Sequence, residues 1–217
     1  MKYTALQTLF ARPDLPRIAQ TINETLANER VLRERFRREL TSSVKAEFIA
    51  GETIKHSPAK TKHLRATRKL LGLLDTHFQR QQLGEVFSEK ALICLAHNDY
   101  EPDVVFFEKS KADLFTDDQM EFPVPDFIAE VLSESTEHCD RGVKFDDYAD
   151  HGVAEYWIID GDEAAIEQYR LEGTRYKLAQ KVVQGSIESL IIPGFRIPVA
   201  AIFDDRHYQS ALRGLLD

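Results

Sequence analysis

Residues 125–136 read PDFIAEVLSEST and place an acid inside an apolar run. The run from Phe127 to Leu132 has the apolar character of a buried β-strand, yet Glu130 stands in the middle of it. Side chains alternate between the two faces of a strand, so Glu130 shares its face with Ile128 and Leu132. A buried carboxylate is strongly unfavourable unless it is protonated or paired with a cation. The sequence therefore requires a partner for Glu130 inside the core.

A second carboxylate is expected from a neighbouring strand. Asp126 is a poor partner for Glu130, because four residues along one strand span roughly 13 Å. Asp103 is the natural candidate, since it follows Pro102 and opens the apolar strand DVVFFE. Strands lie about 4.8 Å apart, so two such carboxylates can surround one cation. Taken alone, Asp103 is equally well explained as a turn aspartate, which is common after proline.

A cationic partner is expected from the segment STEHCDRGVKFDDYADHG, residues 135–152, which predicts a helix that ends at Gly152. If this helix packs back on the sheet, Lys144 can reach the two carboxylates. Two carboxylates and a lysine suit metal-dependent hydrolysis of phosphodiester bonds. The carboxylates hold the metal, the metal lowers the pKa of a bound water, and the lysine orients that water or stabilises developing charge.

Structural interpretations stay open for both charged groups. Glu130 is alternatively one half of a buried ion pair with a lysine or arginine. Lys144 is alternatively one half of a helix-face pair with Asp140 or Asp147.

The rest of the chain predicts an α/β (α+β) domain with a mixed sheet. An N-terminal helical arm is expected over residues 16–40, and KAEFIAGETIKHS predicts a hairpin that turns at Ala50-Gly51. A long helix opens near Ser57-Pro58, and residues 109–124 form a polar loop. The apolar face of the long helix is expected at Leu64, Thr67, Leu71, Leu74 and Phe78. Further strands are expected at EVFSEKALICL, DVVFFE, DFIAEVLS, EYWIID and AIEQYRL, and strand-like pieces broken by prolines at SIESLIIPGFRIPVAAIFDD.

Composition places the chain among soluble proteins. Its 217 residues suit one domain at 46–217 with a helical extension at 1–45, and the 43% hydrophobic and 29% charged content is ordinary. No membrane segment and no secretory signal is expected. Cys94 and Cys139 lack metal-ligand spacing and fit a reducing cytoplasm. The net charge of −8 argues against a protein that coats nucleic acid, but leaves room for a local basic groove.

These motifs carry a resemblance. YEPDVVFFE, VPDFIAEVLSEST, DRGVKFDDYADHGVAEYWIID and SLIIPGF resemble the bacterial restriction endonuclease-like family of the PD-(D/E)XK nuclease superfamily, over about residues 45–205. The first 45 residues match less clearly. The resemblance implies a restriction-endonuclease-like mixed β-sheet flanked by helices. It also implies Asp103 and Glu130 as metal carboxylates and Lys144 as the catalytic lysine. The usual spacing of the superfamily would put that lysine at position 132, where this chain has Leu132.

Two further residues fit the resemblance. AEFIAGE matches the family's first hairpin and contains Glu47, and His63 matches its first long helix. We expect both as outer-shell groups around the metal, with a strand-face or surface position as the alternative.

A basic segment, KHSPAKTKHLRATRK, is the best candidate for contact with phosphate. It contains six lysines and arginines and no acidic residue. We expect Lys62, Arg65 and Arg68 to bind nucleic acid. A solvated helix face explains the segment equally well.

The expected function is that of an endodeoxyribonuclease, a hydrolase dependent on Mg²⁺ or Mn²⁺ that acts on DNA in the cytoplasm as a homodimer. RNA is a rival substrate, because the same site cuts either backbone. The alternative is a catalytically weak or inactive nuclease-fold module that acts through binding or structure as a dimer. The acidic charge and the displaced lysine keep that alternative open.

Overall fold

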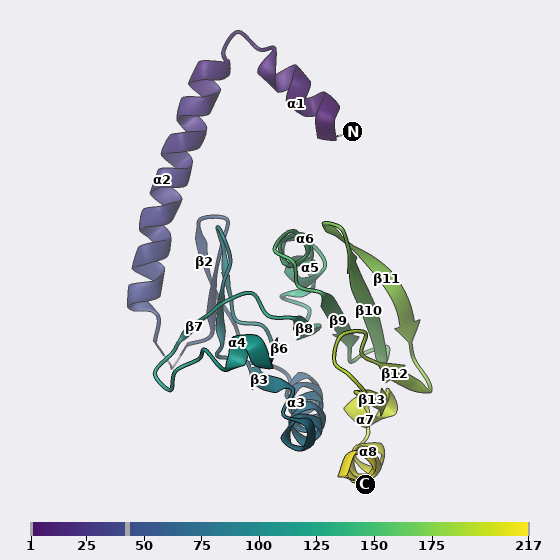
Figure 1. The fold of residues 1–217 in the computed structure, drawn as a ribbon. Helices are drawn as coiled ribbons and strands as arrows, with labels where there is room; N and C mark the ends of the chain where they lie inside the picture. Colours follow the sequence, from purple (N-terminus) through teal and green to yellow (C-terminus); the bar gives the residue numbers. More distant parts are fainter. Residues whose placement is uncertain (1, 42–43, 217) are drawn as a thin grey trace.

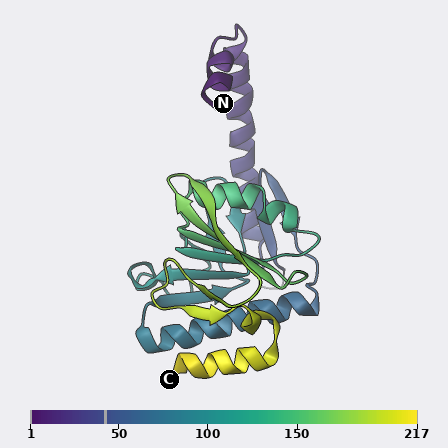
Figure 2. The same ribbon diagram turned by 90° about the vertical axis from the view of Figure 1, so that its right-hand side faces the viewer.

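The computed structural model describes residues 2–41 and 44–216. Figure 1 and Figure 2 show a body of sheets and helices from which a long helical arm projects. The helices are α1 (Lys2–Phe10), α2 (Leu15–Glu39), α3 (Thr61–Gln81), α4 (Lys109–Ala112), α5 (Glu137–Asp140), α6 (Val143–Asp150), α7 (Ala200–Phe203) and α8 (Asp205–Leu216). The strands are β1 (Ala46–Ile49), β2 (Glu52–Lys55), β3 (Gly84–Ser88), β4 (Leu92–Cys94), β5 (Asp99–Tyr100), β6 (Val104–Glu108), β7 (Glu121–Phe122), β8 (Phe127–Val131), β9 (Glu155–Asp160), β10 (Ala165–Glu172), β11 (Arg175–Val182), β12 (Ser186–Glu188) and β13 (Arg196–Pro198).

The strands form a six-stranded sheet, a five-stranded sheet and a two-stranded ribbon. The six-stranded sheet has the order β11-β10-β9-β8-β6-β3, and the five-stranded sheet has the order β2-β1-β5-β4-β7. Within the larger sheet, β8 and β9 run parallel and the other neighbours are antiparallel. The expected mixed sheet with flanking helices is therefore confirmed, although the strands divide between separate sheets.

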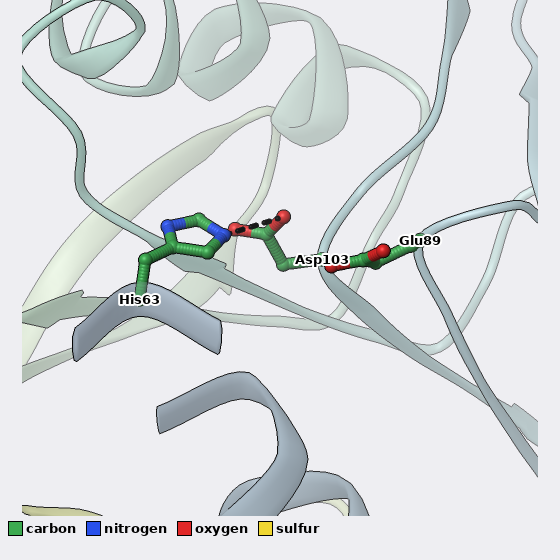
Figure 3. A group of neighbouring side chains, drawn as sticks. All are labelled: His63, Glu89 and Asp103. Atoms are coloured by element: carbon green, nitrogen blue, oxygen red, sulfur yellow. Dashed lines mark ion pairs between the residues drawn. The ribbon is translucent and has the colours of Figure 1, made fainter. Parts of the chain in front are cut away.

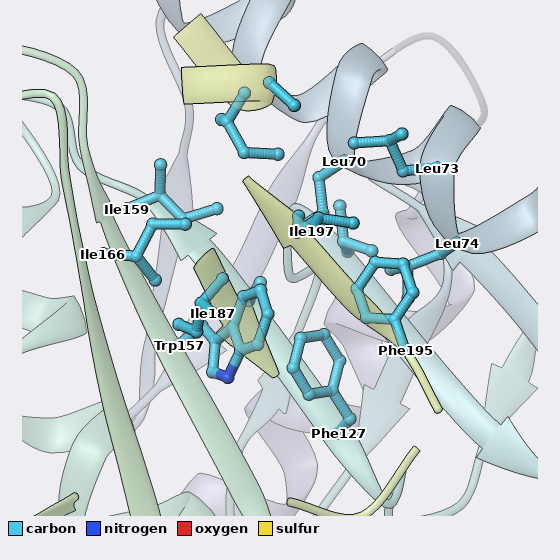
Figure 4. Packing of buried hydrophobic residues seen from close by; sticks show 14 of the residues in the cluster. Leu70, Leu73, Leu74, Phe127, Trp157, Ile159, Ile166, Ile187, Phe195 and Ile197 are labelled. Atoms are coloured by element: carbon cyan, nitrogen blue, oxygen red, sulfur yellow. The ribbon is translucent and has the colours of Figure 1, made fainter. Parts of the chain in front are cut away.

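Alternation along β8 sends its side chains into two different cores. Phe127 and Ala129 face a cluster formed with α3, α7, α8 and the ribbon β12-β13 (Figure 4). In this cluster the Trp157 ring meets Phe127 edge to face and stacks with Phe195. Ile128 faces the opposite cluster, which also contains Tyr148 of α6. Glu130 lies on this second face, between the six-stranded sheet and α6.

The β1-β2 hairpin turns where the sequence predicts. Ala50 and Gly51 both have positive φ, at 50° and 85°, as a two-residue hairpin turn of the favoured twist requires. A side chain at position 51 would also meet Glu29 of α2, because an added Cβ would lie 3.1 Å from the Glu29 Cγ. This hairpin carries Glu47 into the middle of the molecule.

The arm is anchored through the C-terminal half of α2. Arg33 and Arg37 both pair with the buried Asp99, at 2.6 and 2.7 Å from its Oδ1. Phe36 is buried, with its ring centroid 5.8 Å from that of Phe48 in β1. The N-terminal part of α2 extends beyond the body, and α1 turns away from the far end of α2 at a wide angle (Figure 1). The helix expected over 16–40 is confirmed, and the domain boundary at 45 stays a prediction.

The helix predicted over residues 135–152 is wrong in its continuity. It is broken into α5 and α6 at Gly142, where an added Cβ would lie 2.6 Å from the His138 carbonyl oxygen. Thr136 directly precedes α5 but makes no side-chain capping hydrogen bond. Gly152, with φ of 89°, ends the segment as expected.

Other differences concern segments whose structure depends on distant partners. α3 begins at Thr61 rather than near Ser57. Thr67, Leu74 and Phe78 are buried as predicted, whereas Leu64 is 47% exposed and the buried face also includes Leu70 and Leu73. The loop predicted over 109–124 contains α4 and β7, because β7 finds a parallel partner in β4. The prediction lacks β11, α7 and α8, whose pairing or packing partners lie elsewhere in the chain. Across the described residues, every helix is too short or too polar to cross a membrane.

Candidate active site

Strand pairing brings the two predicted carboxylates together. Val104 of β6 lies opposite Ala129 of β8, so Asp103 and Glu130 meet at the same end of this antiparallel pair. The Asp103 backbone N–H donates to Glu130 Oε2 at 3.2 Å, and the Val131 N–H donates to Asp103 Oδ2 at 2.9 Å. Both side chains are buried. Each carboxylate is thus fixed by the backbone of the other's strand.

Lys144 of α6 is the cation that faces Glu130. Its Nζ lies 3.1 Å from Glu130 Oε1, 2.9 Å from Glu47 Oε1 and 3.2 Å from Asp140 Oδ1, and its side chain is 2% exposed. The Tyr148 hydroxyl also donates to Glu130 Oε1, at 3.0 Å. α6 therefore folds back over the sheet as expected. The predicted helix-face pair with Asp140 is present as well, within a larger buried network.

Glu47 extends this network towards a histidine that the sequence did not single out. Its Oε1 accepts the Glu101 backbone N–H at 3.0 Å, and its Oε2 lies 3.0 Å from His56 Nε2. Burial opposes ionisation of Glu47, but the Lys144 ammonium and His56 outweigh it and hold the pKa of this carboxyl below its usual value. Glu47 is thus a charged partner of Lys144.

Buried carboxylates crowd together at this place, and His56 and His63 contact two of them. Burial opposes ionisation of Asp103, but His63 and Lys45 hold its pKa below the usual range. Burial raises the pKa of Glu130, and the nearby Asp140 and Asp103 act in the same direction against Lys144. Four buried carboxylates share the region with two lysines; the carboxylates are Glu47, Asp103, Glu130 and Asp140, and the lysines are Lys45 and Lys144. A divalent cation would relieve the repulsion among them.

A group of metal-type donors lies beside this network (Figure 3). His63, Glu89 and Asp103 each offer a ligand atom, and the three atoms lie within 4.8 Å of one another. His63 Nε2 is 3.3 Å from Asp103 Oδ1, an oxygen that also accepts from Lys45 Nζ at 2.7 Å. One imidazole nitrogen and two carboxylate oxygens are a suitable donor set for a divalent metal ion. Within the described part of the chain, these three donors thus fit a divalent metal ion, the cofactor that the sequence predicts.

Glu130 does not belong to this donor group. Its Oε1 is taken up by Lys144 and Tyr148 and its Oε2 by the Asp103 N–H. The role of Glu130 as a metal ligand stays a prediction, and so do the catalytic roles of Asp103 and Lys144.

Glu89 is the potential ligand that sequence reasoning missed. β3 pairs with β6 with Ser88 opposite Val104, so Glu89 lies beside Asp103, and its N–H donates to the Asp103 carbonyl oxygen at 3.2 Å. The sequence places it inside EVFSEKALICL, which is expected as one strand, whereas the structure ends β3 at Ser88 and begins β4 at Leu92. The register that makes this place meaningful is not encoded locally.

The site opens into a cavity of about 820 Å³. Asp103, Glu130 and Lys144 line this cavity. His63 and His56 line it as well. This volume is ample for a segment of a polymeric substrate.

The three predicted nucleic-acid-binding residues do not lie together. Lys62 lines the cavity, and Arg65 and Arg68 are not among its lining residues. The Arg68 guanidinium lies 6.0 Å from the ring centroid of Tyr208 in α8, on the side of α3 that faces the C-terminus. Contact of these residues with nucleic acid stays a prediction.

Comparison with known proteins agrees with this fold. The Uma2 family model, described as "Putative restriction endonuclease", matches residues 33–200. "Uncharacterized protein sll1609" of Synechocystis sp. (strain ATCC 27184 / PCC 6803 / Kazusa) is 34% identical over 160 residues, which cover 71% of this chain and 88% of that protein. A crystal structure of a "putative nuclease belonging to DUF820" from Anabaena variabilis ATCC 29413 has a TM-score of 0.65 at 17% identity, over 82% of this chain and 97% of that one. The chain therefore belongs to the Uma2 family of restriction endonuclease-like proteins.

Proposed function

We propose that the protein is a metal-dependent endonuclease that hydrolyses phosphodiester bonds of DNA. The observation that carries the proposal is the buried meeting of Asp103, Glu130 and Lys144 on the floor of a cavity, with His63 and Glu89 beside them. Membership of a family described as restriction endonucleases supports the same reaction class.

The residues of the site have distinct roles in this proposal. Asp103, His63 and Glu89 would hold the metal, and Glu130 would position Lys144 beside it. Mg²⁺ or Mn²⁺, when bound, polarises the phosphoryl oxygen and lowers the pKa of the attacking water. Lys144 is kept cationic by its carboxylate neighbours, and its ammonium stabilises the charge that builds up on the phosphoryl group.

A nicking assay tests the proposal. Supercoiled plasmid, single-stranded DNA and RNA are incubated with the protein and either Mg²⁺ or Mn²⁺. We expect metal-dependent cleavage of DNA, and we expect Asp103→Asn to lower its rate by about 100-fold or more. Cleavage of DNA without cleavage of RNA would identify DNA as the substrate. Absence of cleavage of every substrate would contradict the proposal.

Asp126→Asn is the matched control. Asp126 precedes β8 as Asp103 precedes β6, and it accepts the Glu108 N–H and the Lys111 ammonium, both at 2.8 Å, outside the cavity lining. Added Mn²⁺ should raise the melting temperature of the wild type and of Asp126→Asn, because a ligand that binds only the folded state stabilises it. The same addition should leave Asp103→Asn unchanged.

The second candidate is an inactive nuclease-fold binding module that acts as a dimer. The contact of Lys45 Nζ with Asp103 Oδ1 favours it, because that carboxylate already has a cationic partner without a metal. In this case calorimetry with Mn²⁺ would give no heat that depends on Asp103. The homodimer is a prediction under both candidates, and light scattering measures it.

A further inference from the structure

Two ion pairs cross the mouth of the cavity. Lys60 Nζ lies 2.7 Å from Glu134 Oε1, and Lys62 pairs with Asp162. The four residues line the same cavity as Glu130 and Lys144, but their side chains are largely exposed, whereas those of Glu130 and Lys144 are buried. The pairs therefore stand at the entrance to the candidate active site.

Both acids are presented by loops with defined internal hydrogen bonds. The Asp160 carboxylate accepts the N–H groups of Asp162 and Glu163, at 2.8 and 3.0 Å, and so shapes the β9-β10 turn. The Ser133 and Thr136 hydroxyls lie 2.8 Å apart across the turn that carries Glu134. The acids thus reach Lys60 and Lys62 from two different loops, which follow the neighbouring parallel strands β8 and β9.

An ammonium group that binds a carboxylate oxygen can equally bind a phosphate oxygen. Exposed ion pairs contribute little to stability, so a phosphodiester can displace these carboxylates at low cost. His63 directly follows Lys62 in the chain, and its side chain contacts Asp103 in the candidate active site. A phosphate held at the entrance would therefore belong to the same strand of nucleic acid whose neighbouring phosphate enters the site.

We infer that Lys60 and Lys62 form a phosphodiester-binding rim of the cavity, and that Glu134 and Asp162 occupy this rim in the absence of nucleic acid. The inference rests on the proposed function, and it assigns the regulation of substrate entry to four residues at the mouth. The acids compete with the backbone of the substrate, so they limit the affinity for nucleic acid.

Oligonucleotide binding under non-cleaving conditions tests the inference. Fluorescence anisotropy is measured with short fluorescein-labelled single-stranded and duplex DNA in EDTA, for the wild type and for Glu134→Gln/Asp162→Asn. Breaking the two exposed pairs should raise the affinity by roughly tenfold. The matched control is Glu39→Gln/Asp113→Asn, which removes the same charge from the exposed pairs Arg35–Glu39 and Lys109–Asp113, away from the cavity.

The quadruple variant that adds Lys60→Gln and Lys62→Gln identifies the groups responsible. If the lysines bind phosphate, their removal should abolish the gain of the acid double variant and reduce the slope of affinity against salt by about two units. Thermal melting of each variant checks that the fold is retained.

Each outcome bears on one idea. A gain equal to that of the control, a gain that survives loss of both lysines, or no binding by any variant would overturn the rim. A wild type that cleaves DNA while the acid double variant binds no more tightly overturns the rim and leaves the nuclease proposal in place. A wild type that never cleaves while the lysine-dependent gain is present overturns the nuclease proposal and leaves the rim.

Discussion

Lys144 is held by carboxylates from three elements, and this decides what its removal should do. Glu47 comes from β1, Glu130 from β8 and Asp140 from α5. If Lys144 stabilises charge at the phosphoryl group, Lys144→Ala should lower the cleavage rate by orders of magnitude. Its affinity for Mn²⁺ should stay the same or rise, because a positive charge near the metal is removed. Single-turnover rates and calorimetry on this variant measure both quantities.

Lys69→Ala is the control for burial of a lysine. Lys69 is as deeply buried as Lys144, and its Nζ lies 2.8 Å from Asp205 Oδ1, outside the cavity lining. This variant should lose stability and keep its cleavage rate per folded molecule. Full activity of Lys144→Ala would reduce Lys144 to a structural ion-pair partner.

At the scale of elements, the corner between α5 and α6 is tied to β10. Arg141 lies at this corner, and its Nη1 and Nη2 donate to the two oxygens of Glu167, at 2.7 and 3.1 Å. The bond from Arg141 lowers the pKa of Glu167 from 4.5 to about 2, although partial burial opposes this. The unfolded chain takes up this proton near pH 4.5 and the folded chain only near pH 2. The stabilisation is therefore complete above pH 4.5 and is lost as the pH falls towards 2.

Glu167→Gln should remove this pH-dependent stabilisation. The difference in free energy of unfolding between the wild type and Glu167→Gln should shrink steadily as the pH is lowered from 4.5 towards 2. Urea denaturation across this range measures it. Glu172→Gln, which breaks an exposed 3.5 Å contact with Lys177 at the end of the same strand, should show only a small difference. A constant difference for Glu167→Gln would contradict the assignment.

The C-terminal half of α2 should contribute to the stability of the body, whereas the first part of the arm should not. A chain that starts at residue 28 keeps Arg33, Phe36 and Arg37 and should melt close to the wild type. A chain that starts at residue 44 leaves Asp99 without both guanidinium partners and uncovers Phe48, so its melting temperature should fall. Calorimetry of the two truncated chains compares them. Equal melting temperatures would support a domain boundary at residue 45.

At the scale of the whole molecule, the carboxylate pair could be predicted because each member stands in a local pattern. Asp103 follows a proline at the start of an apolar strand, and Glu130 interrupts an apolar run. Only one strand pairing, β6 with β8, was needed to bring them together. The place of Lys144 followed from the helical segment predicted after β8, although the structure divides this segment into α5 and α6.

The remaining contacts arise between segments that no local pattern connects. Glu89 and Lys45 both reach Asp103, one from the end of β3 and the other from the residue before β1. Arg68 is turned towards Tyr208 by the packing of α8 against α3, which the sequence of α3 does not reveal. Prediction therefore succeeded for two paired strands and the helical segment that follows one of them, and failed where the partner comes from a distant part of the chain.

Leu132 shows how little the order of residues along the chain constrains this chemistry. It lies two residues beyond Glu130, its N–H continues the ladder by donating to the Ile159 carbonyl oxygen at 2.9 Å, and its side chain lines the cavity. A lysine at this position would share a strand face with Glu130. Leu132→Lys combined with Lys144→Leu yields an isomer of the protein with the same atoms and the same net charge.

The isomer should cleave faster than Lys144→Leu alone, although more slowly than the wild type, because Glu47 and Asp140 lose their shared cation. Plasmid nicking by the two variants compares them, and equal rates would mean that the helix holds the ammonium in a place the strand cannot reach. A faster isomer would mean that the position of the ammonium in space matters more than the position of the lysine in the sequence. Two related chains can then carry this lysine on different elements and still place its ammonium at the same point of the site.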